Sequence, residues 1–473
     1  MMAIRNRRLP PVVQQLALPL DAKPNRAAVD RPVDVVLAAI VVALIGFGVV
    51  MVYSASAVQA TLHMHDPQFF LKRQAAYAFV GLVLFFLIGA FDYHRLYKLT
   101  YPVLGGVGIL LLMCVAGLGH SGGGATRWLA LGPVHVQPAE MSKLALVCWL
   151  SYSLAKKAEK VKTFTVGFLP HLLVAGIFML LCMKQPDFGS SVVLLLLTFT
   201  MLFVAGAKVG YILGASILGA VFGAVSIMSK QYRLDRYMAW MNMDQHRADL
   251  AYQPFQSVMA FGSGGTWGTG VGKGLQTLYL PEAHNDFIAA IIGEELGFVG
   301  ILTLCIVYLA LVARGVRAAY RAPDDYGSYL AFGISTMFGV QALVNLCVAL
   351  AILPTKGLTL PFLSFGGSSL LVNAAAAGIL LNVSRQGMDP PVPERETPEA
   401  PPVEEFSMPV EEFSMPADDA ERSGAAEALG GFWGRTPAKH EGESSMPDEG
   451  DSVASALGEP TVLGDAKAIS ETA

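Results

Sequence analysis

The sequence predicts an all-α membrane protein with ten transmembrane helices. Of its 473 residues, 53% are hydrophobic and only 15% are charged, and the mean hydropathy is +0.50. Soluble domains carry about 25% charged residues, so this composition excludes an ordinary soluble enzyme. Apolar segments near the length that crosses a bilayer, about 17–25 residues, recur along the chain. They lie at roughly 33–53, 75–91, 99–118, 139–155, 166–183, 188–205, 209–228, 286–313, 328–353 and 366–383.

The two ends of the chain differ from this apolar region. Residues 1–32 are polar and basic and lack the apolar run and cleavage site of a signal peptide, so we expect a disordered cytoplasmic arm. Residues 384–473 hold 20 acidic and 6 basic residues and few large apolar ones. Such a segment cannot bury enough surface to fold alone. The predicted organisation is therefore an arm (1–32), a transmembrane domain (33–385) and a disordered acidic cytoplasmic tail (386–473).

The basic residues predict the orientation of the helices. Cytoplasmic loops of membrane proteins carry an excess of Lys and Arg. The loops on the side of the N-terminus hold 16 of these residues, and the short loops on the other side hold 5. Both termini are thus expected in the cytoplasm, with loops 119–138 and 229–285 outside, the latter between spans 7 and 8. The basic residues form no continuous stripe, so nucleic-acid binding is not expected.

Ionisable side chains within or beside the spans are candidate site residues, because burying charge in a membrane is costly. Glu140 and Lys143 begin the fourth span, and their spacing of three places them on one helical face where they can pair. The predicted topology brings six such residues to the outer leaflet: Arg127, Glu140, Lys143, Asp187, Asp286 and Lys356. Basic groups beside carboxylates suit an anionic lipid-linked ligand and proton-transfer chemistry.

Each of these side chains also has a structural interpretation. Asp187 and Asp286 could be helix N-caps. The pair of Glu140 and Lys143 could serve only to fix helix packing. Arg127 and Lys356 could extend toward lipid headgroups.

Three further features accompany Asp286. His284 has no second His or Cys at ligand spacing, so we expect a hydrogen-bonding neighbour and not a metal ligand. Glu294 and Glu295 are adjacent and lie deeper, so at least one is expected to face the protein interior. The run 267–274 resembles a phosphate loop but lacks its first Gly and its final Ser or Thr. We interpret it as a flexible loop that lets the backbone approach a substrate or partner.

Taken together, six motifs resemble those of the SEDS family (shape, elongation, division and sporulation proteins). The motifs are Gly124-Ala125-Thr126-Arg127-Trp128, Gln137-Pro138-Ala139-Glu140, Lys184-Gln185-Pro186-Asp187-Phe188-Gly189, Leu280-Pro281-Glu282-Ala283-His284-Asn285-Asp286-Phe287, Gly293-Glu294-Glu295-Leu296-Gly297 and Leu360-Pro361-Phe362-Leu363-Ser364-Phe365-Gly366-Gly367-Ser368-Ser369. The resemblance covers about 33–385. Pro354-Thr355-Lys356-Gly357 and the long tails are more similar to division members than to elongation members. Asn285 stands where the family more often has Thr.

The resemblance implies a peptidoglycan glycosyltransferase. Such an enzyme polymerises lipid II, an undecaprenyl-pyrophosphate-linked disaccharide-pentapeptide, into β-1,4 glycan strands on the outer face of the bacterial cytoplasmic membrane. For a division member this would occur at the septum, with a class B penicillin-binding protein transpeptidase and other division-complex proteins as partners. The family's catalytic carboxylate corresponds to Asp286. The expected substrate-binding residues are Arg127, Glu140, Lys143, Asp187, His284 and Lys356.

The reaction inverts an α-linked donor to a β-linked product, so one carboxylate acting as general base suffices. Asp286 would deprotonate the acceptor hydroxyl while the pyrophosphate leaves on the opposite face. Arg127, Lys143 and Lys356 could offset the charge that grows on the leaving group. The sequence shows no dedicated metal cage. A divalent cation, Mg or Mn, would be held mainly by phosphate and one or two carboxylates.

Two other functions are compatible with ten spans: a lipid II flippase and a division scaffold. A transporter typically places its charged site near the midplane on broken helices. Here the charges lie at span ends on one side, and only Glu294 and Glu295 reach deeper. A scaffold would recruit partners through the disordered tails, which is compatible with catalysis. The sequence favours the polymerase.

Overall fold

A computed structural model of the chain describes residues 32–122, 125–131, 134–229, 231–355 and 357–387. All of these belong to one compact unit, Met1–Glu396. The predicted arm, the predicted acidic tail and Lys356 lie outside the described residues.

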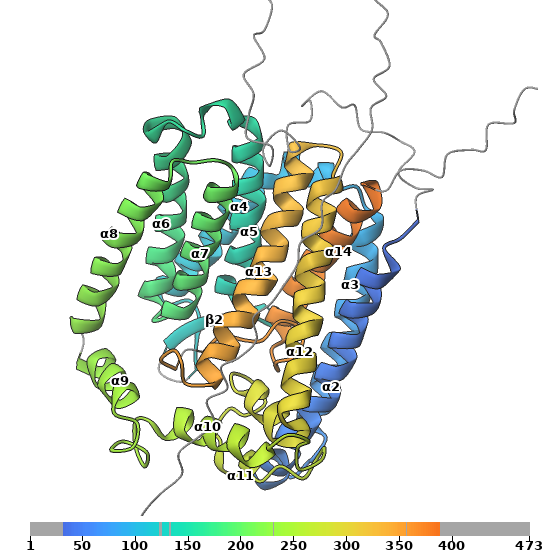
Figure 1. Cartoon of the computed structure of the whole chain (residues 1–473), viewed down its shortest axis with the longest axis vertical. Helices are drawn as coiled ribbons and strands as arrows, with labels where there is room; N and C mark the ends of the chain where they lie inside the picture. The colour runs from blue at the N-terminus through green and yellow to red at the C-terminus, as the bar shows by residue number, and fades with distance from the viewer. Residues whose placement is uncertain (1–31, 123–124, 132–133, 230, 356, 388–473) are drawn as a thin grey trace, which may run out of the picture. The chain divides into compact units, whose positions relative to one another are not determined.

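Within the described ranges, ten long helices follow the ten predicted apolar segments (Figure 1). They are α2 (Val35–Met64), α3 (Phe69–Ala90), α4 (His94–Val115), α5 (Pro138–Lys156), α6 (Leu169–Lys184), α7 (Phe188–Val204), α8 (Val209–Met228), α12 (Ile288–Arg321), α13 (Asp325–Ala349) and α14 (Gly367–Gln386). Eight of these helices are long and apolar enough to cross a membrane. Among them, α6 is counted together with the π-helical turn that precedes it, Phe164–Phe168. The other two are α5 and α7. The chain is thus a polytopic helical membrane protein, and the exact number of spans stays a prediction.

Helix α12 is bent where the sequence predicted one long span. Gly297 inside it has φ 67° and ψ −164°, so two helical segments meet there at a kink. Glycine takes a positive φ without the clash that a Cβ would cause. The helix begins at Ile288, two residues after the predicted start, and this places Asp286 in the preceding loop.

Most of the regular structure outside the long helices lies in the predicted outer loops. Loop 119–138 forms a small antiparallel sheet of β1 (His120–Gly122), β2 (Ala125–Leu131) and β3 (Val134–Val136), in the order β1-β2-β3. The long loop contains α9 (Gln231–Met241), α10 (Tyr252–Gly264) and α11 (Gln276–Tyr279). Figure 1 shows these three helices together at one end of the bundle, where α12 begins. The sheet is the one departure from an all-α description among the described residues.

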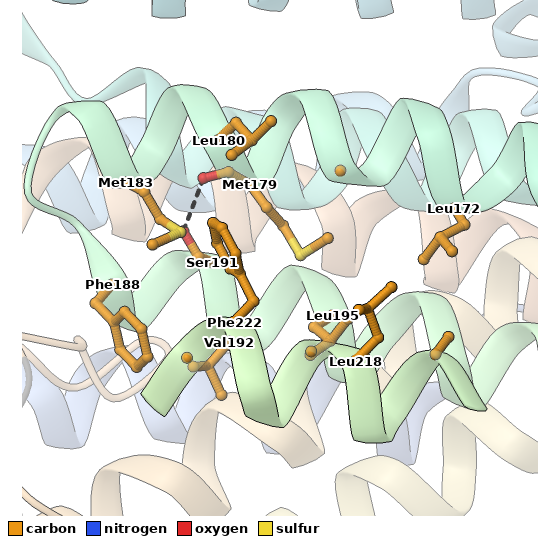
Figure 2. Close-up of a pocket in the computed structure, with 14 residues that line it drawn as sticks. Leu172, Met179, Leu180, Met183, Phe188, Ser191, Val192, Leu195, Leu218 and Phe222 are labelled. Carbon is orange, nitrogen blue, oxygen red and sulfur yellow. Dashed lines mark hydrogen bonds between the residues drawn. The ribbon is translucent and has the colours of Figure 1, made fainter. Parts of the chain in front are cut away.

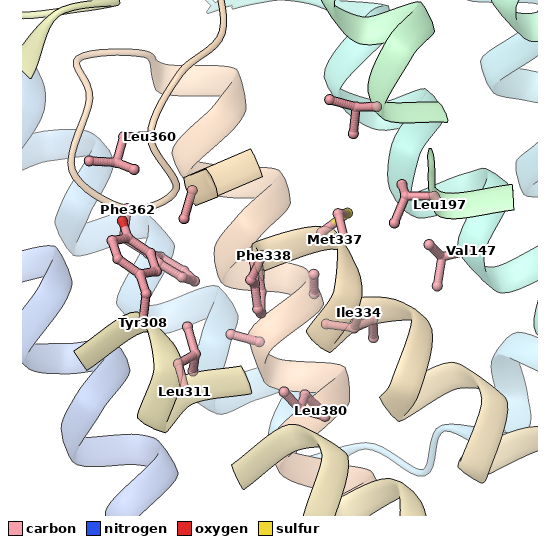
Figure 3. Close-up of a cluster of buried hydrophobic side chains, with 14 of the residues drawn as sticks. Val147, Leu197, Tyr308, Leu311, Ile334, Met337, Phe338, Leu360, Phe362 and Leu380 are labelled. Carbon is pink, nitrogen blue, oxygen red and sulfur yellow. The ribbon is translucent and has the colours of Figure 1, made fainter. Parts of the chain in front are cut away.

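The core lies where α12, α13 and α14 meet the loop before α14 (Figure 3). Phe338 of α13 packs on Phe362 of that loop, with ring centroids 5.1 Å apart. The hydroxyl of Tyr308 in α12 donates to the Pro361 carbonyl at 2.5 Å. Helix α8 is the opposite case, because it has no buried residue. The loop before α14 is therefore fixed in the core, and α8 packs loosely against its neighbours.

The Gly-rich run packs against the kink in α12. The amides of Thr269 and Gly270 donate to the carbonyls of Glu294 and Glu295 at 3.0 and 2.9 Å, and Phe298 donates back to Gly265 at 2.9 Å. A kink leaves backbone groups without helical partners, and the loop satisfies them. The close backbone approach expected from the glycines does occur, but its partner is α12 of the same chain.

Gly268→Ala should destabilise the protein. Gly268 has φ +80°, and a Cβ there would clash with the Glu295 carbonyl. The left-handed backbone alone costs an L-residue about 1–2 kcal/mol, so we expect a lower thermal unfolding midpoint in detergent. Gly262→Ala is the matched control, because its Cβ would meet nothing within 4 Å. Equal midpoints for both variants would contradict the packed loop.

Candidate active site

Asp286 lies in the loop before α12 and does not cap that helix. The N-cap is Phe287, with no side-chain cap hydrogen bond, so the N-cap interpretation of Asp286 is wrong. Its side chain is half-buried. The backbone of Gly357 lies against its carboxylate, since a Cβ on Gly357 would sit 3.1 Å from Asp286 Oδ2. Lys356, one of the predicted substrate-binding residues, precedes Gly357 in the chain but lies outside the described residues.

Asn345 on α13 holds the position of Asp286. Its Nδ2 donates to the Asp286 carbonyl at 3.0 Å and to the Leu358 carbonyl at 2.6 Å. The side chain is buried, at 1% exposure. It therefore joins the loop before α12 to the loop before α14. The sequence interpretation missed Asn345, although a polar side chain within a predicted span was an available signal.

The environment of Asp286 makes its carboxyl group a weak acid. Burial raises the pKa of Asp286 to about 7, and the negative charge of Glu282 adds to the rise. The charge of Arg127 lowers this pKa, and that of Asp187 raises it slightly further. Arg127, Asp187 and Glu282 are therefore close enough to act on Asp286. A carboxyl group that ionises near neutral pH is suited to accept a proton in catalysis.

Arg127 in β2 is anchored to the turn between α6 and α7. Its Nε donates to the Gln185 carbonyl at 3.0 Å and its Nη2 to the Pro186 carbonyl at 2.7 Å. Carbonyl groups carry no net charge, so these bonds orient the guanidinium without neutralising it. The arginine is held in place by the protein, in contrast to a side chain that merely extends toward lipid headgroups.

Asp187 is the N-cap of α7, as one of its two interpretations predicted. Its Oδ1 accepts from the Ser190 amide at 3.0 Å, and its Oδ2 accepts from the Ser190 hydroxyl at 2.7 Å. The side chain is buried. Its carboxylate is thus committed to the helix start, while its charge still acts on Asp286.

Glu140 and Lys143 form the predicted pair, inside the bundle. Lys143 Nζ lies 2.8 Å from Glu140 Oε1 and also donates to Gln341 Oε1 at 2.8 Å. Ser369 donates to Glu140 Oε2 at 3.2 Å. Glu140 and Lys143 are 3% and 1% exposed. The pair joins α5 to α13 and α14, the helices that border the Asp286 site.

His284 packs against aromatic rings. Its ring centroid is 4.4 Å from that of Phe70 and 5.5 Å from that of Phe365. Its buried Nδ1 has no hydrogen-bond partner among the described residues. Burial lowers the pKa of His284, which favours the neutral ring. Its backbone carbonyl accepts from the Phe365 amide at 2.9 Å, so this residue too joins the two loops.

Glu294 and Glu295 both face the interior, which confirms that at least one does. Glu294 accepts hydrogen bonds from the amides of Leu275 and Gln276 at the start of α11. Glu295 accepts from the Ser54 hydroxyl of α2 at 2.6 Å. The two carboxylates hold the segment that leads to Asp286.

An apolar cavity of about 400 Å³ lies between α6, α7 and α8 and extends along them from Phe188 to Leu172 (Figure 2). Phe188 and Ser191, in the first turn of α7, line it. In the described part of the chain, no group of three or more His, Cys, Asp or Glu side chains could hold a metal ion. A divalent cation bound through the substrate's phosphates stays a prediction.

Fold and site together define a multi-pass helical membrane protein with a group of ionisable side chains, among them Asp286, gathered around the loop before α12. The chain belongs to the FTSW_RODA_SPOVE family of cell cycle proteins, whose model matches residues 35–388.

Relatives and solved structures agree with this family. A protein of Geobacter metallireducens named "Probable peptidoglycan glycosyltransferase FtsW" is 44% identical to this chain. The match covers 77% of this chain and 98% of the Geobacter protein. "Stage V sporulation protein E" of Bacillus subtilis is 38% identical, and the match covers 74% of this chain and 97% of the Bacillus protein.

Two solved structures are similar in fold. One, described as "Structural coordination of polymerization and crosslinking by a peptidoglycan synthase complex", has a TM-score of 0.64 at 30% identity and covers 75% of this chain and 98% of its own. The rod shape determining protein RodA of Thermus thermophilus has a TM-score of 0.54 at 29% identity and covers 78% of this chain and 100% of its own.

Lys143→Met should destabilise the protein strongly. It leaves Glu140 buried without its partner, and breaking a buried ion pair on one side costs about 3–5 kcal/mol. We expect a clear drop in the thermal unfolding midpoint in detergent. The double variant Glu140→Gln/Lys143→Met removes both charges and should recover most of the loss. If both proteins melted at the same temperature, the pair would not be what stabilises this region.

Proposed function

We propose that this chain is a peptidoglycan glycosyltransferase that polymerises lipid II into β-1,4 glycan strands during septal cell-wall synthesis. Its family and the names of its relatives support this activity. The single structural observation that carries the mechanism is Asp286. It is a half-buried carboxyl group with a pKa of about 7, and the charge of Arg127 acts on it.

In the proposed reaction Asp286 acts as the general base. It accepts the proton of the acceptor 4-hydroxyl as that oxygen attacks the anomeric carbon of the donor. The bond to the pyrophosphate breaks on the opposite face of the sugar, which gives inversion. A base with a pKa near the working pH is ionised often enough to act and basic enough to take the proton.

Arg127 compensates the charge that grows on the departing pyrophosphate. Its guanidinium is oriented by two carbonyls and keeps its full charge. Such fixed charges stabilise a transition state without reorganising. We propose that Lys356 adds to this charge compensation, because its chain neighbour Gly357 lies against the Asp286 carboxylate. Glu140, Lys143 and Asp187 support the site from within the protein, since each is committed to a partner there.

The site faces the outside of the cytoplasmic membrane in this proposal, with ten spans and both termini in the cytoplasm. The excess of basic residues in the loops on the side of the N-terminus supports that orientation. We propose a class B penicillin-binding protein transpeptidase as partner, together with other division-complex proteins. The resemblance in fold to a peptidoglycan synthase complex that couples polymerisation to crosslinking supports this partner.

The flippase alternative loses its main support within the fold. A lipid II transporter would use charged groups along a path through the bundle. The deeper carboxylates Glu294 and Glu295 accept hydrogen bonds from α11 and α2 of the same chain, so they are committed to structure. A scaffold role concerns the terminal segments, and it is compatible with catalysis.

Asp286→Asn should abolish polymerisation while the protein still inserts and binds its transpeptidase. Loss of a general base typically costs about 10²–10⁴ in rate. The measurement is glycan-chain formation from lipid II by purified protein with its partner. Asp244→Asn, an exposed residue of the long outer loop, is the matched control and should keep full activity. Polymerisation by purified Asp286→Asn at the wild-type rate would overturn the assignment.

The pH profile should report the ionisation of Asp286. Only the deprotonated carboxylate can accept a proton, so kcat/KM should rise with pH and level off above about 7. Glu282→Gln removes a neighbouring negative charge, which should lower the pKa of Asp286 and move the rise to lower pH. Glu282 is exposed, so the fold should tolerate this change. A rise at the same pH in both proteins would argue against Asp286 as the titrating base.

A further inference from the structure

Helix α9 (Gln231–Met241) is tied to the ends of α8 and α13, two helices that are long and apolar enough to cross a membrane. It begins directly after α8, and Arg233 donates to the carbonyl and the hydroxyl of Ser226, in the last turn of α8, at 3.0 and 2.7 Å. Near its other end, Nε1 of Trp240 donates to the Ala351 carbonyl, just beyond the end of α13, at 2.8 Å. Figure 1 shows α9 at the edge of the bundle, beside the end of α8. These bonds hold α9 at the level where the two helices leave the bilayer.

One face of α9 is apolar and exposed. Leu234, Tyr237, Met238 and Met241 follow the spacing i, i+3, i+4, i+7, which places them on one side of a helix. The last three are 37%, 48% and 59% exposed. The charged residues of α9 lie outside this face, and Ala239, on the opposite side, is fully buried. A helix with one apolar side and one charged side, held at a bilayer boundary, is typical of helices that lie in the lipid–water interface.

The residue that accepts the Trp240 bond has a strained backbone. Ala351 has φ +55°, in the left-handed region, where a Cβ is unfavourable. It ends α13 in a Schellman motif, in which its amide donates to the Val348 carbonyl at 3.0 Å and the Ile352 amide to the Cys347 carbonyl at 2.8 Å. Glycine is the usual residue at this position. An alanine there depends on support from its surroundings, and Trp240 provides a hydrogen bond to it.

The turn at Ala351 begins the loop that reaches the proposed base. The chain runs from this turn to Gly357, whose backbone lies against the Asp286 carboxylate. Asn345 fixes the far end of this stretch through the Leu358 carbonyl, and α9 fixes the near end. The backbone beside the carboxylate is therefore held between one anchor inside the bundle and one in α9.

We propose that α9 lies in the lipid–water interface of the membrane and that Trp240, held by this anchor, positions the loop beside Asp286. Contact with lipid thus stabilises the backbone that covers the carboxylate. The effect on catalysis rests on the proposed function, whereas the contact between α9 and lipid does not depend on it.

The position of α9 can be measured in vesicles of phosphatidylethanolamine and phosphatidylglycerol. Nitroxide labels on Met238→Cys and Met241→Cys should collide more often with oxygen, which concentrates in the bilayer, than with a water-soluble nickel chelate. A label on Asp244→Cys, an exposed position beyond the end of α9, should show the reverse. The unsubstituted protein, whose five cysteines are buried or half-buried, gives the background. Labels on α9 that prefer the nickel chelate would show a face turned to water or to a protein partner and would overturn the proposal.

Trp240→Phe removes the indole donor and keeps an aromatic ring. We expect kcat to fall about fivefold, the factor that loss of one hydrogen bond typically gives, with little change in KM. The loosened loop admits water to Asp286, which lowers the pKa of its carboxyl group and moves the rise of kcat/KM to lower pH. Adding Ala351→Gly should restore both readouts, because glycine takes the left-handed backbone without support. Trp267→Phe, at a side chain that is 80% exposed in the Gly-rich run, is the matched control and should change neither readout.

The two experiments separate this proposal from the proposed function. Wild-type protein that forms no glycan chains from lipid II would overturn the proposed function, and the label positions would still decide where α9 lies. Polymerisation by wild type, with the same kcat and pH profile in Trp240→Phe, would overturn the positioning role of Trp240 alone. A loss in Trp240→Phe that Ala351→Gly does not restore would show that the indole acts elsewhere, and it would overturn that role as well.

Discussion

The ion pair between Glu140 and Lys143 is the interaction on which the site depends. Two charges buried in a membrane protein are tolerated only when they are paired and hydrogen-bonded. Here the pair reaches Gln341 of α13 and Ser369 of α14, so it fixes three helices at one depth. One helical turn beyond Gln341, Asn345 holds the loop that carries Asp286. The position of the proposed base thus follows from charge compensation inside the bundle.

The carboxylates of this protein differ in role because their surroundings differ. Asp187 receives two hydrogen bonds from Ser190, and Glu294 receives backbone amides from α11. Donors of this kind commit the carboxylate oxygens to the fold. Asp286 is instead held through its backbone carbonyl, and burial raises its pKa. This difference separates the group proposed for proton transfer from those that support it.

The bundle has a rigid part and a loosely packed part. The loop before α14 is fixed in the core by Tyr308 and Asn345, so the groups proposed to meet the sugar and pyrophosphate have defined positions. Helix α8 buries none of its residues and borders an open apolar cavity. A reacting centre needs fixed geometry, which the rigid part of the bundle provides.

The sequence by itself determined the helices and the pairing of Glu140 with Lys143, and it gave the cap at Asp187 as one of two interpretations. These depend on composition, on a spacing of three residues and on a residue next to its helix, all of which are local. It did not predict the kink at Gly297, the sheet around Arg127 or the bond from Asn345 to Asp286. Only the tertiary structure decided those, and it also decided that Glu295 contacts Ser54, 241 residues away. Contacts of this kind arise when distant helices pack and their polar groups must find partners within the protein.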